Sequence, residues 1–358
     1  MLNSKMFLIG RDPSRKARAR TLADRALRLS PDLGEAHLAL GLCFYRIDKD
    51  YEAALRELAI AAANLPNDPD VLETLGQIYL YQGRWREAVP TLQRAQDLDP
   101  QTPHQYLAAT YRALRDWPAA AAAYQRLQRI GGENEPNNVW ARVALAYVEL
   151  FRTGNVAAGK AILEKIPPGV DPNAQVTLAK WDFAMFERNF DAAEQVLAEY
   201  PSEEFPPPMR DPKVYYRGCV ALARGDTASA QTLFEKARPF FELRVHDHPD
   251  DPLFLGPLAH LYAFMGRKED AINASRHAVE LVPAGKNAAE APDYATILAV
   301  VYAWTGEVDQ SIAMIEPLLS TPGGLILAEL RLRWEWDPLR SDSHFKEILA
   351  APEPKTIY

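Results

Sequence analysis

Residues 71–100 read VLETLGQIYLYQGRWREAVPTLQRAQDLDP, and this stretch decides the fold. Its small and large side chains recur at the spacings at which two antiparallel helices interlock, turn and stop. Gly76 and Ala88 allow the two helices to approach closely, Gly83 supplies the turn, and Pro100 ends the second helix because proline cannot continue it. The stretch therefore predicts a helical hairpin and indicates a scaffold rather than an enzyme.

The same pattern returns twice in nearly complete form. The first of these copies has its pattern residues at Leu258, Ala259, Tyr262, Gly266, Ala271, Ala278 and Pro283. The second has them at Leu298, Ala299, Tyr302, Gly306, Ser311, Ile315 and Leu318. Repetition of one hairpin predicts an array in which each unit contacts its neighbours.

Weaker copies extend the array to eight expected helical pairs. A copy at 40–66 has one extra residue in its turn RIDKDY, at 46–51, which we expect to be accommodated in a loop. In the copy that opens at Leu107, Trp117 and Pro118 should begin the second helix, as proline in a first turn permits. Three further pairs are expected at 140–166, 176–200 and 214–237.

The two ends differ from the middle of the array. Residues 18–31 match only the second helix of a unit, through Ala19, Ala23, Ala26 and Pro31. We predict a partial N-terminal repeat or cap at 1–33, the repeat array at 34–322, and a C-terminal capping segment and tail at 323–358. The turn-forming residues of 131–138 and 201–212 make these two breaks candidate hinges, of which 201–212 is the stronger.

The N-terminal helix is strongly basic, with seven basic and two acidic residues between Arg11 and Arg28. A solvated outer face explains such a helix most simply, and a docking patch is the alternative.

Composition sets further limits on the function. The net charge of −8 argues against general affinity for nucleic acid, which needs a basic face. No stretch approaches the roughly 18 apolar residues of a membrane span, so no membrane partner is expected. Cys43 and Cys219 lie within expected helices and read as small core residues. These features together predict a cytoplasmic protein.

The spacings of the three best copies resemble those of the tetratricopeptide repeat. A narrower resemblance lies at 330–349, LRLRWEWDPLRSDSHFKEIL, which is similar to the segment that closes tetratricopeptide regions of large bacterial signalling proteins. Residues 336–340 match that form, whereas Ser343 and His344 replace its Pro-Arg pair. The resemblance implies a regulatory array linked to an adenylate cyclase, a serine/threonine kinase or a winged-helix transcription regulator. Phe345 and Ile348, with neighbouring apolar residues, should cover the last repeat as a lid.

Motifs of catalysis are absent from the sequence: there is no GxxxxGK[ST], GxSxG, HExxH or paired CxxC pattern. His246 and His248, with nearby carboxylates, are weak candidates for a metal site, because imidazoles so spaced also occur at the polar exit of a helix. We therefore expect no cofactor and no enzymatic activity.

The resemblance implies that the first helix of each pair lines a concave groove. The residues expected to face a ligand there are Tyr45, Arg46, Glu73, Gln77, Tyr81, Arg112, Arg142, Glu149, Tyr215, His260, Phe264 and Trp304. For each aromatic residue among them, packing against the next repeat is the alternative. Arg112 and Arg142 could pair with an acidic peptide, whereas the lysine and asparagine set of chaperone-binding relatives is missing.

The sequence thus predicts an all-α fold, a right-handed α-solenoid of tetratricopeptide-like helix pairs. Its expected function is that of a non-catalytic scaffold or adaptor that holds a peptide or protein in the concave groove. Two alternatives stay open: a regulatory or oligomerisation module of a linked cyclase, kinase or transcription regulator, and an unrecognised metal-dependent enzyme. Self-association also stays open.

Overall fold

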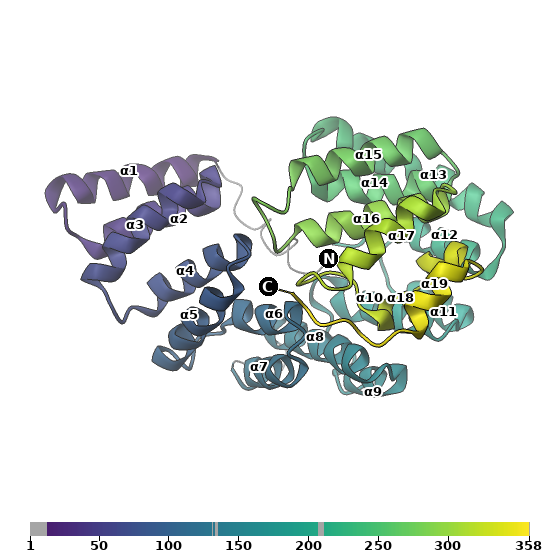
Figure 1. Ribbon diagram of the computed structural model, residues 1–358, viewed down its shortest axis with the longest axis horizontal. Helices are drawn as coiled ribbons and strands as arrows, with labels where there is room; N and C mark the ends of the chain where they lie inside the picture. Colours follow the sequence, from purple (N-terminus) through teal and green to yellow (C-terminus); the bar gives the residue numbers. More distant parts are fainter. Residues whose placement is uncertain (1–12, 131, 133–134, 207–210, 358) are drawn as a thin grey trace.

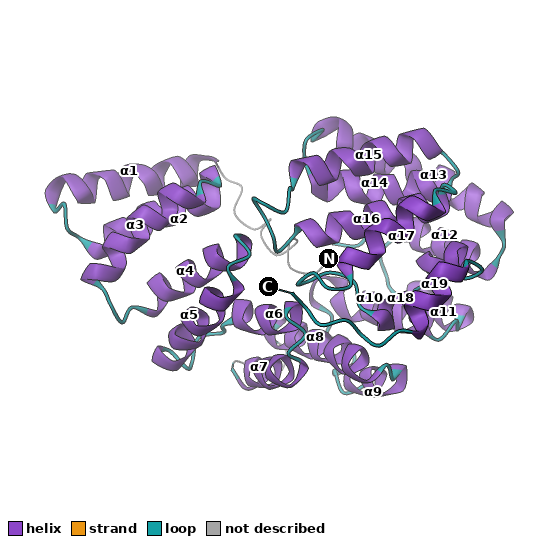
Figure 2. Cartoon of the chain, in the orientation of Figure 1, coloured by secondary structure: helices purple, strands orange, loops and turns teal. Residues whose placement is uncertain are grey.

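The computed structural model describes residues 13–130, 132, 135–206 and 211–357 (Figure 1). Within these ranges the regular secondary structure is helical (Figure 2). The one β-type pairing among the described residues is an isolated antiparallel bridge between Glu204 and Pro212. The predicted all-α solenoid of helix pairs is confirmed.

Eight helical pairs follow α1 (Pro13–Leu29) in the described part of the chain, as predicted. They are α2 (Gly34–Cys43) with α3 (Tyr51–Asn64), α4 (Pro69–Tyr81) with α5 (Trp85–Leu98), α6 (Gln105–Ala113) with α7 (Trp117–Arg129), α8 (Pro136–Thr153) with α9 (Val156–Leu163), α10 (Gln175–Phe186) with α11 (Phe190–Glu199), α12 (Lys213–Arg224) with α13 (Thr227–Asp247), α14 (Pro252–Phe264) with α15 (Lys268–Leu281), and α16 (Ala291–Trp304) with α17 (Val308–Leu318). In Figure 1 the pairs form an arc from α1 on the left, through α6 to α9 at the bottom, to α14 to α17 on the right.

Small residues let the helices of a pair meet closely. A Cβ atom added to Gly76 would lie 2.5 Å from Leu92 Cγ, and one added to Gly218 would lie 2.5 Å from Phe234 Cε1. Leu92 and Phe234 are fully buried, and burying such a side chain contributes about 1.5–3 kcal/mol. The small and large residues that recur along the sequence are therefore the residues at which the two helices of a pair touch.

The turns within pairs use left-handed backbone. Gly83, Gly266 and Gly306 have φ values of 72°, 75° and 81°. In two pairs an arginine occupies the corresponding position: Arg115 has φ 58° and Arg188 has φ 54°. Left-handed backbone costs a non-glycine residue about 1–2 kcal/mol, so these two arginines need a compensating role.

The extra residue at 46–51 does not form a loop, contrary to our expectation. A π-helical turn, η2 (Phe44–Asp48), continues α2, and Lys49 then adopts left-handed backbone with φ 57°. A π turn accommodates one additional residue within a helix, so the insertion lengthens the first helix. By contrast, α7 begins at Trp117 with Pro118 in its first turn, as predicted.

The C-terminal segment leaves the last pair and crosses the inner side of the arc. It comprises α18 (Leu327–Leu332), the 3₁₀ turn η4 (Trp334–Leu339) and α19 (Ser343–Ala350). Whereas α19 packs on α17, α18 packs against α8, and η4 packs against α16. The segment therefore does more than cover the last repeat.

Two backbone hydrogen bonds join the early pairs to late parts of the chain. Ala288 N donates to Tyr81 O at 2.7 Å, and Gly323 N donates to Ala113 O at 2.9 Å. The solenoid thus contacts itself across its inner side.

The break at 201–212 is partly ordered by backbone bonds, from Phe205 N to Asp211 O at 3.1 Å and from Lys213 N to Glu203 O at 2.7 Å. Residues 207–210 of this break and residues 131, 133 and 134 of the other lie outside the described residues, and both hinges stay predictions. Cys43 and Cys219 are buried free thiols. None of the described helices has both the length and the apolar character needed to cross a membrane.

Candidate binding site on the inner face

A pocket with a volume of 130 Å³ lies where the C-terminal segment meets the early pairs; we call it the inner pocket. For comparison, an apolar cavity of about 150 Å³ holds a benzene molecule. The early pairs line the inner pocket with Arg112, Arg115 and Trp117 of the α6–α7 hairpin and Phe151 of α8. The late pairs contribute His260 of α14 and Asp293, Thr296, Ile297 and Val300 of α16. The C-terminal segment contributes Leu325, Ile326, Glu329, Arg333, Glu335 and Trp336. The inner pocket can therefore accept one side chain or a small molecule.

One wall of the inner pocket is charged. Arg333 lies among three carboxylates, with its guanidinium 3.9 Å from Asp182 Oδ1, 3.6 Å from Glu329 Oε1 and 3.7 Å from Glu335 Oε1. Burial opposes the charge on Arg333, but the three carboxylates outweigh it and raise its pKa. Burial raises the pKa of Glu335, while Arg333 opposes that shift. With Arg112 and Arg115, the lining of the inner pocket holds three arginines and the three carboxylates of Asp293, Glu329 and Glu335.

Next to these charges, the lining continues into an aromatic cluster that contains three predicted groove residues. The centroid of the Phe264 ring lies 5.6 Å from that of the His260 ring, 5.2 Å from that of Trp304 and 5.0 Å from that of Trp334. Trp304 Nε1 donates a hydrogen bond to the carbonyl oxygen of Glu335 at 2.8 Å. His260, Phe264 and Trp304 are thus brought together, and the C-terminal segment covers them.

His260 is held neutral by its surroundings. Burial, with a smaller contribution from the charge of Arg333, lowers the pKa of His260 to about 4. Its Nε2 atom is enclosed and has no hydrogen-bond partner. At neutral pH the ring therefore acts as an uncharged part of the aromatic cluster.

Arg115 forms hydrogen bonds across the edge of the inner pocket. Its guanidinium donates to the carbonyl oxygens of Leu319 at 2.5 Å, Leu325 at 2.6 Å and Pro354 at 3.2 Å, and to Glu353 Oε1 at 3.1 Å. Only 7% of the Arg115 side chain is exposed. The α6–α7 turn is thereby tied to the C-terminal segment and to its tail.

Two other predicted groove residues, Tyr45 and Tyr81, form a separate tyrosine cluster with Tyr51 and Tyr106. The Tyr45 and Tyr81 rings lie 6.0 Å apart, and the residues are 2% and 7% exposed. Burial raises the pKa of both phenols. These side chains pack against the neighbouring pair and the loop at Ala289.

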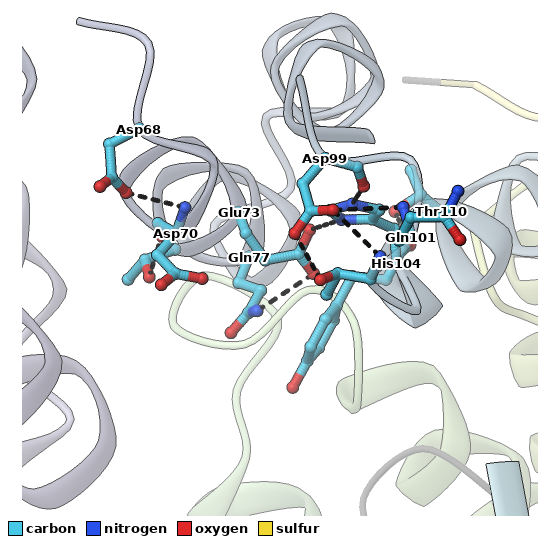
Figure 3. Close-up of polar contacts among 11 residues, drawn as sticks. Asp68, Asp70, Glu73, Gln77, Asp99, Gln101, His104 and Thr110 are labelled. Carbon is cyan, nitrogen blue, oxygen red and sulfur yellow. Dashed lines mark hydrogen bonds and ion pairs between the residues drawn. The ribbon is translucent and has the colours of Figure 1, made fainter. Parts of the chain in front are cut away.

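Glu73 and Gln77 belong to a polar contact between α4 and the start of α6 (Figure 3). His104 Nδ1 donates to Glu73 Oε2 at 2.7 Å, and His104 Nε2 donates to the carbonyl oxygen of Asp99 at 2.8 Å. Gln77 Nε2 in turn reaches Glu73 Oε1 at 3.4 Å. The structure thus engages both residues in contacts between pairs.

The remaining predicted residues lie apart from one another. Arg112 lines the inner pocket. Arg142 reaches the carbonyl oxygen of Lys165 at 3.5 Å, and Glu149 pairs with Arg152 at 2.7 Å. Tyr215 is half-buried between rings of its own hairpin, 5.2 Å from Phe241, and burial raises its pKa. Arg46 is exposed on η2.

The structure brings no third metal-binding side chain to the two candidate histidines among the described residues. His246 and His248 are exposed at the end of α13, and the His248 ring lies 5.3 Å from Phe254. Among the described residues, no group of three histidine, cysteine or acidic side chains is arranged to hold a metal ion.

Sequence reasoning missed four residues of the inner face, which are Arg115, Glu329, Arg333 and Glu335. A signal for the first was present, because Arg115 stands at the turn position that glycine holds in the best copies. The other three come from the C-terminal segment, whose path across the arc no repeat spacing specifies.

Models of the tetratricopeptide repeat match residues 14–70, 45–110 and 257–284. No curated protein matches the chain. A Rap protein complexed with Competence and Sporulation Factor is similar in structure, with 14% identity, a TM-score of 0.50, and coverage of 94% of this chain and 92% of that one. A tetratricopeptide repeat protein from Parabacteroides merdae has 17% identity and a TM-score of 0.48, over 69% of this chain and 93% of its own.

The family matches cover the early pairs and the α14–α15 hairpin, whose spacings had indicated the repeat. The likeness to the Rap protein extends over nearly the whole chain and concerns the fold. The chain therefore carries tetratricopeptide repeats, set within a solenoid of helix pairs.

Proposed function

We propose that this protein is a scaffold for protein–protein interaction and that it holds a peptide segment of its partner at the inner pocket. The observation that carries the proposal is the inner pocket, at which the α6–α7 hairpin, α16 and the C-terminal segment meet. Tetratricopeptide repeats in general serve as such scaffolds. The similar Rap protein was solved in complex with Competence and Sporulation Factor, which is consistent with a ligand held by this kind of fold.

The lining of the inner pocket favours an anchor residue with an apolar body. Trp117, Ile297 and Val300 offer apolar surface. The lining holds three arginines and three carboxylates, so its charges balance and it does not select for a charged anchor. In the proposed complex the rest of the peptide would extend toward Arg112.

The test is a pull-down from lysate of the source cells with the wild-type chain and two variants. Thr296→Trp places a large ring in the inner pocket, and Arg129→Ala, on the exposed side of α7, is the matched control. We expect partners captured by the wild type to be lost with Thr296→Trp and kept with Arg129→Ala. Retention of every partner by a Thr296→Trp protein with an unchanged circular dichroism spectrum would refute the inner pocket as the binding place.

A second candidate function is control of a linked cyclase, kinase or transcription regulator. Its support is the segment at 330–349, which resembles the closing part of such regulatory arrays, and which provides Asp337 for an ion pair with Arg188. A coding sequence that joins this chain to such a domain would favour this function, whereas a promoter directly before it would count against it.

A further inference from the structure

Residues 351–357 cross the inner side of the arc, and we call them the strap. Pro352 and Pro354 oppose helix formation, and residues 352–357 adopt no regular secondary structure. Figure 1 shows this yellow part of the chain passing from α19 back toward α6. The strap therefore lies on the same side of the arc as the inner pocket.

Glu353 is the residue through which the strap is recognised. Its Oε1 atom accepts a hydrogen bond from Arg115 at 3.1 Å, and its Oε2 atom accepts one from the backbone N–H of Leu327 at 2.9 Å. Because both oxygens of the carboxylate act as acceptors, neither an amide nor a cationic side chain can replace it. The surface under the strap thus selects an acidic residue.

Backbone atoms hold the strap on the C-terminal side of Glu353. Arg115 donates to the carbonyl oxygen of Pro354 at 3.2 Å, and Ile357 N donates to the carbonyl oxygen of Ser320 at 2.8 Å. Main-chain hydrogen bonds of this kind do not depend on the identity of the side chains. Another extended segment that carries an acidic residue can therefore make the same contacts.

The strap is covered little by the rest of the protein. Ala351, Pro352 and Lys355 are exposed, and Ile357 is 76% exposed. Segments with few buried apolar contacts and exposed hydrogen bonds open at a lower free energy than a packed core does. We therefore expect the strap to leave the surface while the helix pairs stay folded.

Arg115 connects the strap to the inner pocket and sets the charge of any replacement. It lines the inner pocket, and only 7% of its side chain is exposed. Burial lowers the pKa of Arg115, and the negative charge of Glu353 opposes that shift. A buried cation that loses its partner is destabilising. A segment that replaces the strap must therefore bring its own acidic residue to Arg115.

We propose that the surface under the strap is a docking site for an extended acidic segment of the partner, and that the strap is its built-in competitor. This inference rests on the proposed function, because a partner segment that extends from the inner pocket toward Arg112 would next meet Arg115. The strap is tethered and competes at an effective concentration on the order of millimolar. Weak ligands are thereby kept out, whereas a partner that is also anchored in the inner pocket displaces the strap.

The test uses the full chain and a labelled synthetic peptide of residues 350–357, AAPEPKTI, whose binding is followed by fluorescence anisotropy. The double variant Glu353→Ala with Ile357→Pro removes the carboxylate and one N–H donor of the strap. Lys355→Ala, at an exposed position of the strap, is the matched protein control. A peptide with lysine in place of its glutamate is the ligand control.

We expect saturable binding of the acidic peptide to the double variant, at least tenfold weaker binding to the wild type and to Lys355→Ala, and no binding of the lysine peptide. Equal affinity of the double variant and the wild type would overturn the proposal. So would the absence of saturable binding to the double variant, or equal binding of the lysine peptide. Circular dichroism checks that each variant is folded, and Ile357→Pro alone replaces the double variant if that protein does not fold.

A second arm separates this inference from the proposed function. Thr296→Trp added to the double variant should leave peptide binding unchanged, since Thr296 lines the inner pocket and takes no part in the hydrogen bonds of the strap. In the pull-down, the double variant should capture several-fold more of the partners that Thr296→Trp loses. Equal capture by the double variant and the wild type would show that the strap does not compete with the partner, and would overturn the inference. Partners that survive Thr296→Trp would instead refute the inner pocket alone.

Discussion

Arg188 and Asp337 form a two-point ion pair, with Arg188 Nη1 2.8 Å from Asp337 Oδ2 and Arg188 Nη2 2.7 Å from Asp337 Oδ1. The pair joins the α10–α11 turn to η4. Arg115 joins the α6–α7 turn to the same C-terminal segment. Both arginines adopt left-handed backbone at a position where glycine would be free of strain. The cost of that conformation is offset by contacts that hold the C-terminal segment across the arc.

The two arginines should differ in their importance for stability. Arg115→Ala should lower the free energy of unfolding by about 2–4 kcal/mol, since it leaves buried carbonyl oxygens without donors. Arg188→Ala should cost about 1 kcal/mol or less, because solvent screens its partly exposed pair. Urea denaturation followed by circular dichroism measures both.

A glycine substitution at position 115 tests the cost of the left-handed backbone there. Arg115→Gly should be about 1 kcal/mol less destabilising than Arg115→Ala, since glycine adopts the left-handed backbone without strain. Equal losses in Arg115→Ala and Arg188→Ala would show that the enclosed contacts of Arg115 do not dominate.

The helix pairs could be predicted from the sequence because the pattern that specifies them is local. Gly76 and Leu92 lie in adjacent helices, and their spacing recurs in other pairs. The inner pocket could not be predicted in this way. Arg115 and Leu325 are 210 positions apart, and their contact depends on the curvature that accumulates over all the pairs between them.

Close helix contact at Gly76 predicts a specific loss of stability. In Gly76→Ala the new Cβ would lie 2.5 Å from Leu92 Cγ, so we expect destabilisation by about 1–3 kcal/mol. Gly285→Ala is the matched control, because no atom lies within 4 Å of the added Cβ. A thermal shift that is the same for both variants would contradict the packing role of Gly76.

His37 and His104 predict that stability falls as the solution becomes alkaline. Each ring faces a carboxylate and a carbonyl oxygen: Glu57 and Pro31 for His37, and Glu73 and Asp99 for His104. Burial lowers the pKa of each histidine, but the hydrogen bonds to these acceptors outweigh it, and the net pKa of both is raised.

The direction of this pH dependence follows from the linkage between proton binding and unfolding. An unfolded histidine has a pKa of about 6.5, so the contribution of these two is complete below that pH and is lost as the pH rises through the folded pKa. We expect the urea midpoint of the wild type to fall above pH 6.5. The double variant His37→Gln with His104→Gln should show a smaller fall, and an identical pH profile would contradict the double hydrogen bonding.

His260 predicts a dependence of opposite sign on the acid side. Burial, followed by the charge of Arg333, lowers the pKa of this ring to about 4, so its contribution to stability is complete above pH 6.5 and decreases as the pH falls toward 4. Phenylalanine keeps a ring against Phe264, which lies 5.6 Å away, and does not titrate. His260→Phe should therefore lose less stability between pH 6.5 and 4 than the wild type does. The readout is the urea midpoint at each pH, and His344→Phe, which alters a half-exposed histidine on α19, is the control. If His260→Phe and the wild type lose stability in parallel over this range, the ring is not held neutral by the aromatic cluster.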